Sequence, residues 1–210
     1  IVRPRVSVVT NIGMSHIERL GSREGILKAK MEIFEGMGAN PAAVVNADDP
    51  LLRKGVKGLE IPVVYYGIDG GDYRAADIRT RGDRGVSYRL MAEGKSFEVT
   101  LPLPGRHNVY NSLAAVAVGR LFDIDYEKII EALGRLEGEN MRLAILTTPD
   151  GIKVINDAYN ASPDSMKSAL EVLRDTQGSR KIAVLSDMLE MGEYAEEGHA
   201  LVGSYAAQSG

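Results

Sequence analysis

Short β-rich segments that alternate with helical patterns restrict the fold of this chain more than any other feature. The segments are RVSVVTN (5–11), AAVVN ending at Asn46, and PVVYYG (62–67), and a helical pattern follows each of the first two. This alternation is typical of βα units, which build a parallel sheet. Residues 73–101 then form strand-like runs separated by Gly-containing turns, which predicts an antiparallel meander. Helical patterns over 105–122 and 125–136 follow, so we expect an α/β fold with a mostly parallel sheet.

A second α/β unit is expected after a boundary near EGENMR (137–142). Beyond it we predict strands over 143–148 and 152–157, a helix over 163–176, a strand over 181–187 and a helix from about Tyr194. We therefore divide the chain into a partial central domain (1–140) and a partial, Rossmann-like C-terminal domain (141–210). Because the sequence begins with Ile1 and ends in a helical run, we expect the chain to be a piece of a longer protein.

Composition narrows the class of partner. The net charge is -4 and basic residues form no run, which disfavours nucleic acid and anionic membranes. The sequence has no apolar run near the ~20 residues of a membrane span. The absence of cysteine and the presence of only three histidines exclude disulfides and thiolate metal sites and disfavour zinc. Small-molecule partners and a cytoplasmic location are expected.

Lys30 is an anomaly in the predicted helix 22–37. Helical spacing places it in the middle of an apolar side with Ile26, Ile33, Phe34 and Met37, where burial penalises its charge. The lysine either extends past apolar neighbours to water, or is a buried amine that is paired, neutral or covalently altered so that it binds a metal.

His16 lies in the loop TNIGMSH, at the carboxyl end of the first predicted strand. Open α/β sheets bind ligands at this end. The alternative is a surface histidine with a local hydrogen bond.

Asn108 and Asn111 are one helical turn apart near the start of the helix 105–122. Side-chain amides offer a donor and an acceptor side by side, which matches the edge of adenine. Helix capping is the competing explanation for Asn108.

Asp157 follows a predicted strand, where a carboxylate can accept hydrogen bonds from ribose hydroxyls or can close an Asx-turn. Asp187 and Glu190 hold a similar position after the next predicted strand, although both could be solvated loop charges. Arg142, at the expected domain joint, could reach a phosphate or form a surface salt bridge. The phosphate-loop pattern GxxxxGK[ST] does not occur, so a bound nucleotide would lack that cradle.

These motifs together resemble the Mur ligase family, the ATP-dependent amide-forming enzymes of peptidoglycan precursor synthesis. The loop TNIGMSH, the helix with AKMEIF, the segment GRHNVYNSLAA and the strand-end acid occur in the family's order, from about Val6 to the last residue. NDAYNASPDSM and SDMLEMGEYAEEGH resemble the branch that adds D-alanyl-D-alanine to UDP-N-acetylmuramoyl tripeptide. Asn160 stands where other branches and folylpolyglutamate synthases carry histidine.

The resemblance implies a role for each candidate. Lys30 matches a lysine carried as a carbamate, and His16 a ligand that helps it hold Mg²⁺ against phosphate. Asn108 and Asn111 match the adenine-contacting pair, Asp157 the ribose-binding acid and Arg142 the phosphate-binding arginine, with Tyr159 and Asn160 beside them. ATP and Mg²⁺ are the expected cofactors.

The resemblance also places the phosphate loop and the sugar-binding domain before Ile1, so the isolated segment is expected to be inactive. Two alternatives remain open at this point. One is another Mur ligase or a folylpolyglutamate synthase, and the other is a non-catalytic α/β module that binds adenine nucleotides.

Overall fold

A single mixed sheet organises the first two thirds of the chain. The computed structural model describes residues 2–15 and 17–209. The sheet has the order β1-β2-β3-β4-β5-β6, built from β1 (Val6–Val9), β2 (Ala42–Asn46), β3 (Val63–Gly67), β4 (Tyr73–Thr80), β5 (Val86–Ala92) and β6 (Lys95–Leu101). Strands β1 to β4 pair in parallel, whereas β4, β5 and β6 pair antiparallel. The predicted parallel sheet and meander are both present.

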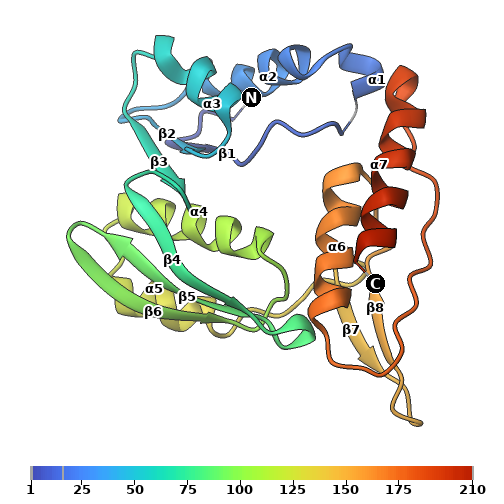
Figure 1. Cartoon of the computed structure of the whole chain (residues 1–210). Coiled ribbons are helices and arrows are strands. Elements are labelled where there is room, and N and C mark those ends of the chain that lie inside the picture. Colours follow the sequence, from blue (N-terminus) through green and yellow to red (C-terminus); the bar gives the residue numbers. More distant parts are fainter. Residues whose placement is uncertain (1, 16, 210) are drawn as a thin grey trace.

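Helices cover both faces of the parallel part of this sheet and one face of the meander (Figure 1). The elements are α1 (Ile17–Leu20), α2 (Arg23–Met31), η1 (Glu32–Phe34), α3 (Pro50–Gly55), η2 (Val56–Gly58), η3 (Gly82–Arg84), α4 (His107–Leu121) and α5 (Tyr126–Leu133). Strand β2 is buried along its whole length. Its Val44 packs in the core shared with α4 and α5, whereas Ala43 and Val45 face the core beneath α2 and α3. This two-sided burial explains why the strand is uniformly apolar up to Asn46.

The predicted helix 22–37 is shorter than expected. α2 ends at Met31, and the 3₁₀ turn η1 follows. A 3₁₀ turn advances ~120° per residue, so the side chains after Met31 leave the face that α-helical spacing assigns to them. Ile26 and Phe34 are buried as predicted, but Ile33 is 45% exposed. The apolar face around Lys30 is therefore smaller than the sequence suggested.

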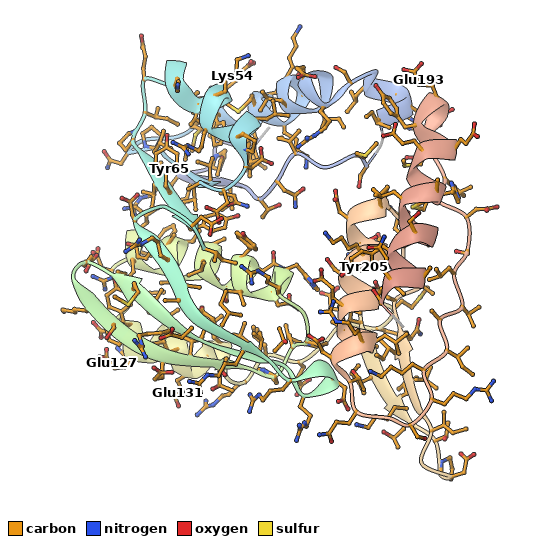
Figure 2. The ribbon with its side chains drawn as sticks, viewed as in Figure 1. Lys54, Tyr65, Glu127, Glu131, Glu193 and Tyr205 are labelled. Carbon is orange, nitrogen blue, oxygen red and sulfur yellow. The ribbon has the colours of Figure 1, made fainter. Side chains whose placement is uncertain are left out.

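The last third of the chain is a hairpin with two packed helices. β7 (Ala144–Thr147) and β8 (Lys153–Asn156) pair antiparallel, and α6 (Pro163–Asp175), η4 (Gly192–Tyr194) and α7 (Ala195–Gln208) follow. Ser162 caps α6 in a capping box with Ser165. The Tyr205 hydroxyl on α7 donates a hydrogen bond to Glu171 on α6 (3.0 Å), and Figure 2 shows Tyr205 where the two helices meet.

The strand predicted over 181–187 is not formed. This segment is irregular, with Ile182 64% and Val184 93% exposed. β propensity stabilises a strand only when a neighbouring strand completes its hydrogen bonds. Among the described residues, the sheet of this region contains only β7 and β8, and neither pairs with 181–187.

Two sets of contacts join this region to the rest of the molecule. At one, Thr80 of β4 donates a hydrogen bond to Asp175 of α6 (2.8 Å), and the Asp83 N–H donates to the Thr176 hydroxyl (3.0 Å). At the other, the Glu18 N–H in α1 donates to the Glu190 carbonyl (3.3 Å). Within the described ranges, no helix is both long enough and apolar enough to cross a bilayer.

Candidate functional site

Lys30 lies in the last turn of α2 and reaches the loop that follows β1. Its Nζ donates a hydrogen bond to the Asn11 carbonyl oxygen (2.8 Å). Partial burial lowers the pKa of the Lys30 amine, and the nearby carboxylate of Asp49 opposes this. Lys30 is nevertheless exposed, as is Lys28 two residues earlier. Of the alternatives that the sequence left open, the structure therefore has the lysine that extends past apolar neighbours to the surface, and its amine is hydrogen-bonded to a backbone carbonyl there and is not buried.

Asp49 is a buried carboxylate that binds the same loop, and it is not among the residues that the sequence predicted for the site. Its Oδ2 accepts a hydrogen bond from the Ile12 N–H (2.7 Å). Its Oδ1 accepts from the N–H groups of Leu51 (2.9 Å) and Leu52 (3.1 Å), so it is also the N-cap of α3. An aspartate directly before Pro50 predicts the start of a helix. This local pattern gives no sign of the contact between Asp49 and the loop.

Arg23 completes the support of the loop from the start of α2. Its Nε and Nη2 donate to the Ile12 carbonyl at 3.1 and 2.8 Å. Asp164, near the start of α6, approaches from the other side, because its Oδ2 lies 3.0 Å from the position that a Cβ on Gly13 would occupy. The loop therefore lies between the sheet region and α6.

His16, the other expected metal ligand, lies outside the described residues. The described ranges contain no cluster of three or more His, Asp and Glu side chains able to hold a metal ion. Mg²⁺ commonly takes only one or two protein carboxylates and fills its other positions with phosphate oxygens and water. A carbamate on Lys30 would have the chemistry of such a carboxylate. Lys30 and His16 would then fit Mg²⁺, and they would not fit a closed cage of protein ligands.

Asn108 and Asn111 form a connected pair of amides at the start of α4. The Asn111 Nδ2 donates to the Asn108 Oδ1 (3.1 Å), and the Asn108 Nδ2 donates to the Pro104 carbonyl (2.7 Å). The N-cap residue of α4 is Arg106, so Asn108 does not cap the helix. The exposed amide of Asn111 keeps a donor and an acceptor for a ligand.

His107, which is not among the candidates predicted from the sequence, connects this pair to the region after residue 140. Its Nδ1 is buried and has no hydrogen-bond partner among the described residues. Burial lowers the pKa of the imidazole, and the carboxylates of Asp157 and Glu171 oppose this. The start of α4 and the strand-end acid are thus near enough to interact electrostatically.

Asp157 binds the joint between the two halves of the chain. Its Oδ1 accepts a hydrogen bond from the Leu143 N–H (3.0 Å), 14 residues away, so it does not close a local Asx-turn. That role belongs to Asn156, whose Oδ1 accepts from the Ala158 N–H (3.2 Å). The other oxygen of Asp157 makes no hydrogen bond within the described chain and remains available to a ligand.

Arg142 and Tyr159 stack on each other at this joint. The Arg142 Cζ lies 4.0 Å from the centre of the Tyr159 ring, and its Nε lies 3.7 Å from a Glu139 oxygen. Tyr159 is 63% exposed, so the stacked guanidinium lies at the surface. Asn160 is also exposed, and its Oδ1 accepts from the Ala161 N–H (2.9 Å).

The two acids predicted after residue 185 have partners within the protein. Asp187 lies 3.7 Å from His199, and Glu190 lies 3.8 Å from Arg19. Both pairs are at the surface, as expected for loop charges. The candidate residues thus form two groups. One surrounds the loop at Asn11 and Ile12, and the other surrounds the start of α4 and the joint at 141–143.

Comparison with known proteins decides the family. The model of the Mur ligase middle domain matches residues 1–119, and that of the Mur ligase glutamate ligase domain matches residues 141–210. The chain belongs to the Mur ligase family. Mur ligase structures also share its mixed sheet and helices, which confirms the predicted α/β fold class.

Several curated Mur ligases are similar to almost the whole chain. The UDP-N-acetylmuramoyl-tripeptide–D-alanyl-D-alanine ligase of Bacillus subtilis is 37% identical over 206 residues, which are 97% of this chain and 44% of that protein. The Escherichia coli enzyme of the same name is 34% identical over 213 residues, 100% of this chain and 47% of that protein. A UDP-N-acetylmuramate–L-alanine ligase from Desulforamulus reducens is 33% identical over 186 residues, 88% of this chain and 40% of that protein. The chain spans about half the length of these Mur ligases.

Solved Mur ligase structures are also similar to almost the whole chain. MurF from Acinetobacter baumannii superposes with a TM-score of 0.91 at 31% identity, over 99% of this chain and 45% of that one. MurF from Thermotoga maritima in complex with ADP superposes with a TM-score of 0.87 at 30% identity, over 97% of this chain and 47% of that one.

Proposed function

We propose that the protein containing this chain is an ATP-dependent amide ligase of the MurF type, which joins D-alanyl-D-alanine to UDP-N-acetylmuramoyl tripeptide. One observation carries this proposal. MurF structures superpose with TM-scores of 0.84 to 0.91 over nearly the whole chain, whereas a MurC structure from the same family reaches 0.66 over 82% of it. Peptidoglycan precursor synthesis in the cytoplasm is the corresponding setting.

The nucleotide is assigned to the group of residues around the start of α4. In this proposal Asn108 and Asn111 bind the adenine edge, and the free oxygen of Asp157 accepts from a ribose hydroxyl. Arg142 binds phosphate, with Tyr159 stacked against its guanidinium. Asn160 lies next to Tyr159 in sequence and is the weakest member of this set. The ADP complex of the Thermotoga MurF supports a nucleotide site in this fold.

The phosphoryl chemistry is assigned to the group of residues around the loop after β1. Here Lys30, as a carbamate, and His16 would hold Mg²⁺, which when bound would supply stabilisation of the negative charge on the phosphoryl group. The substrate carboxylate attacks the γ-phosphorus of ATP, and the bond from that phosphorus to ADP breaks, which gives an acyl phosphate and ADP. The amine of D-alanyl-D-alanine then attacks the acyl carbon, loses a proton and displaces phosphate to form the amide.

A division near residue 140 is part of the proposal. Residues 1–140 belong to the central ATP-binding domain and residues 141–210 to the C-terminal domain, in keeping with the two family matches. The loop after β1 touches both parts, since Met14 packs against the cluster that contains Met166 and Met188. Closure of the second domain onto the first would bring the two groups of site residues together.

Phosphate release by the full-length protein tests the proposal. The protein receives ATP and UDP-N-acetylmuramoyl tripeptide with and without D-alanyl-D-alanine. Parallel reactions contain UDP-N-acetylmuramate with L-alanine, or a folate with glutamate. Release that requires D-alanyl-D-alanine is the expected result. Release driven by another amine would assign a different ligase, and no release with any acceptor would favour a nucleotide-binding module.

A further inference from the structure

Asp49 and Lys30 bind opposite sides of one peptide group. The Asn11 carbonyl and the Ile12 N–H belong to the same peptide unit, which is planar and rigid. Lys30 Nζ donates to its oxygen (2.8 Å), and Asp49 Oδ2 accepts from its N–H (2.7 Å). The lysine, the peptide group and the carboxylate therefore form a continuous hydrogen-bonded chain.

Burial makes Asp49 the more rigid end of this series of hydrogen bonds, and Lys30 the less rigid end. Asp49 is 8% exposed, and Ile12 is 1% exposed. A buried N–H that lost its acceptor would carry the full desolvation penalty of an unpaired donor, so this contact favours a fixed position of the loop. The other oxygen of Asp49 is fixed by two N–H groups of α3, and the neighbouring Ile12 carbonyl is held by Arg23. The Asn11 carbonyl is therefore held in place, whereas the exposed lysine adapts to it.

Hydrogen bonds in such a chain also strengthen one another. Acceptance of the N–H by a carboxylate polarises the peptide group and makes its carbonyl a better acceptor for the lysine. A carbamate nitrogen keeps one N–H, so the same bond remains possible after Lys30 is modified. The bond would then fix the direction in which the new carboxylate points.

We propose that Asp49 is a positioning residue for the phosphoryl-transfer site, acting on Lys30 through the Asn11–Ile12 peptide group. The inference rests on the proposed function, because it assumes that Lys30 serves the reaction. The proposal assigns to Asp49, a buried residue outside the expected site motifs, the role of holding Lys30 in position. Asp49 touches neither substrate nor metal in this proposal.

The test uses Asp49→Ser in the full-length protein. Serine caps helices about as well as aspartate but has a single oxygen, so it keeps the cap of α3 and leaves the Ile12 N–H without its acceptor. Amide hydrogen exchange should rise at least about tenfold at Ile12 and stay slow at Leu51 and Leu52. The kcat should fall about 10- to 100-fold, as for a misplaced catalytic group, with the KM for ATP unchanged.

Asp48→Ser is the matched control. Asp48 binds the Ile68 and Gly70 N–H groups and the Tyr110 hydroxyl, so its loss removes a neighbouring carboxylate without touching the loop. Unchanged exchange at Ile12 in Asp49→Ser, or an unchanged kcat, would overturn the inference. An equal loss of kcat in Asp48→Ser would overturn it as well. A wild-type protein without ligase activity would refute the proposed function instead, and the exchange measurement separates these cases.

Discussion

Gly82 and Thr176 are in direct backbone contact across the two halves of the chain. A Cβ on Gly82 would lie 2.5 Å from both the nitrogen and the Cα of Thr176, and Gly82 has a φ of +57°. Only glycine meets both demands without strain. The contact lies beside the hydrogen bond between Thr80 and Asp175, so this point joins α6 to the sheet domain.

Gly82→Ala should therefore weaken the joint. The substitution combines backbone strain with a collision against Asp175 and Thr176. Gly94→Ala is the control, because Gly94 has a φ of +71° with nothing within 4 Å of an added Cβ. We expect Gly82→Ala to lower the free energy of unfolding by about 1–3 kcal/mol more than Gly94→Ala. Denaturant unfolding measures the free energy of unfolding of both variants. Equal losses in the two would show that the contact between Gly82 and Thr176 does not contribute to stability.

Lys30→Met should abolish most of the ligase activity. The methionine keeps the apolar stem but has no amine to form a carbamate. Loss of one charge-stabilising group typically costs ~10²–10³-fold in kcat. The exposed Lys28, on the same helix, supplies the control Lys28→Met, which should keep near wild-type kcat. With ¹³C-bicarbonate, a carbamate resonance should appear in the wild type and in Lys28→Met and be missing in Lys30→Met. The same resonance in all three proteins would refute the carbamate.

Asn111→Ala should weaken ATP binding without unfolding the protein. The side chain is exposed, so its hydrogen bond to Asn108 contributes little to stability. Loss of one hydrogen bond to adenine is worth ~1–1.5 kcal/mol, a rise of about 5- to 13-fold in the KM for ATP with kcat unchanged. The preference for ATP over GTP should fall in parallel. An unaltered nucleotide preference would place the adenine elsewhere.

His107 should make the protein less stable in mild acid. Burial holds the imidazole pKa of His107 below its ordinary value, so the unfolded chain binds more protons than the folded one as the pH falls through ~6.5. Stability is therefore lost from about pH 6.5 down to the folded-state pKa. His107→Gln removes this effect, and its unfolding free energy should fall less steeply between pH 7.5 and 5.5, by at most ~1.4 kcal/mol per pH unit. Parallel profiles for the two proteins would contradict the assignment.

Local patterns predicted most of the elements correctly. The parallel strands, the meander over 73–101 and the two strands predicted over 143–148 and 152–157 follow from runs of apolar residues and from glycine turns, which act within a few positions. The predictions that failed depend on more distant partners. Whether 181–187 becomes a strand depends on a neighbouring strand. The helix predicted over 22–37 ends at Met31, and Phe34 reaches the core from the 3₁₀ turn that follows.

The sequence by itself determined the α/β class and the candidate site residues, because Lys30, the Asn108–Asn111 pair, Asp157 and Arg142 stand out by residue type and position. Only the tertiary structure decided what supports them. Asp49 lies 37 positions from Ile12, and Gly82 is far in sequence from Thr176, so no local pattern could reveal either contact. Folding brings Ile12 to Asp49 because the carboxyl ends of the parallel strands β1 and β2 meet at one edge of the sheet. Gly82 meets Thr176 because α6 packs against η3.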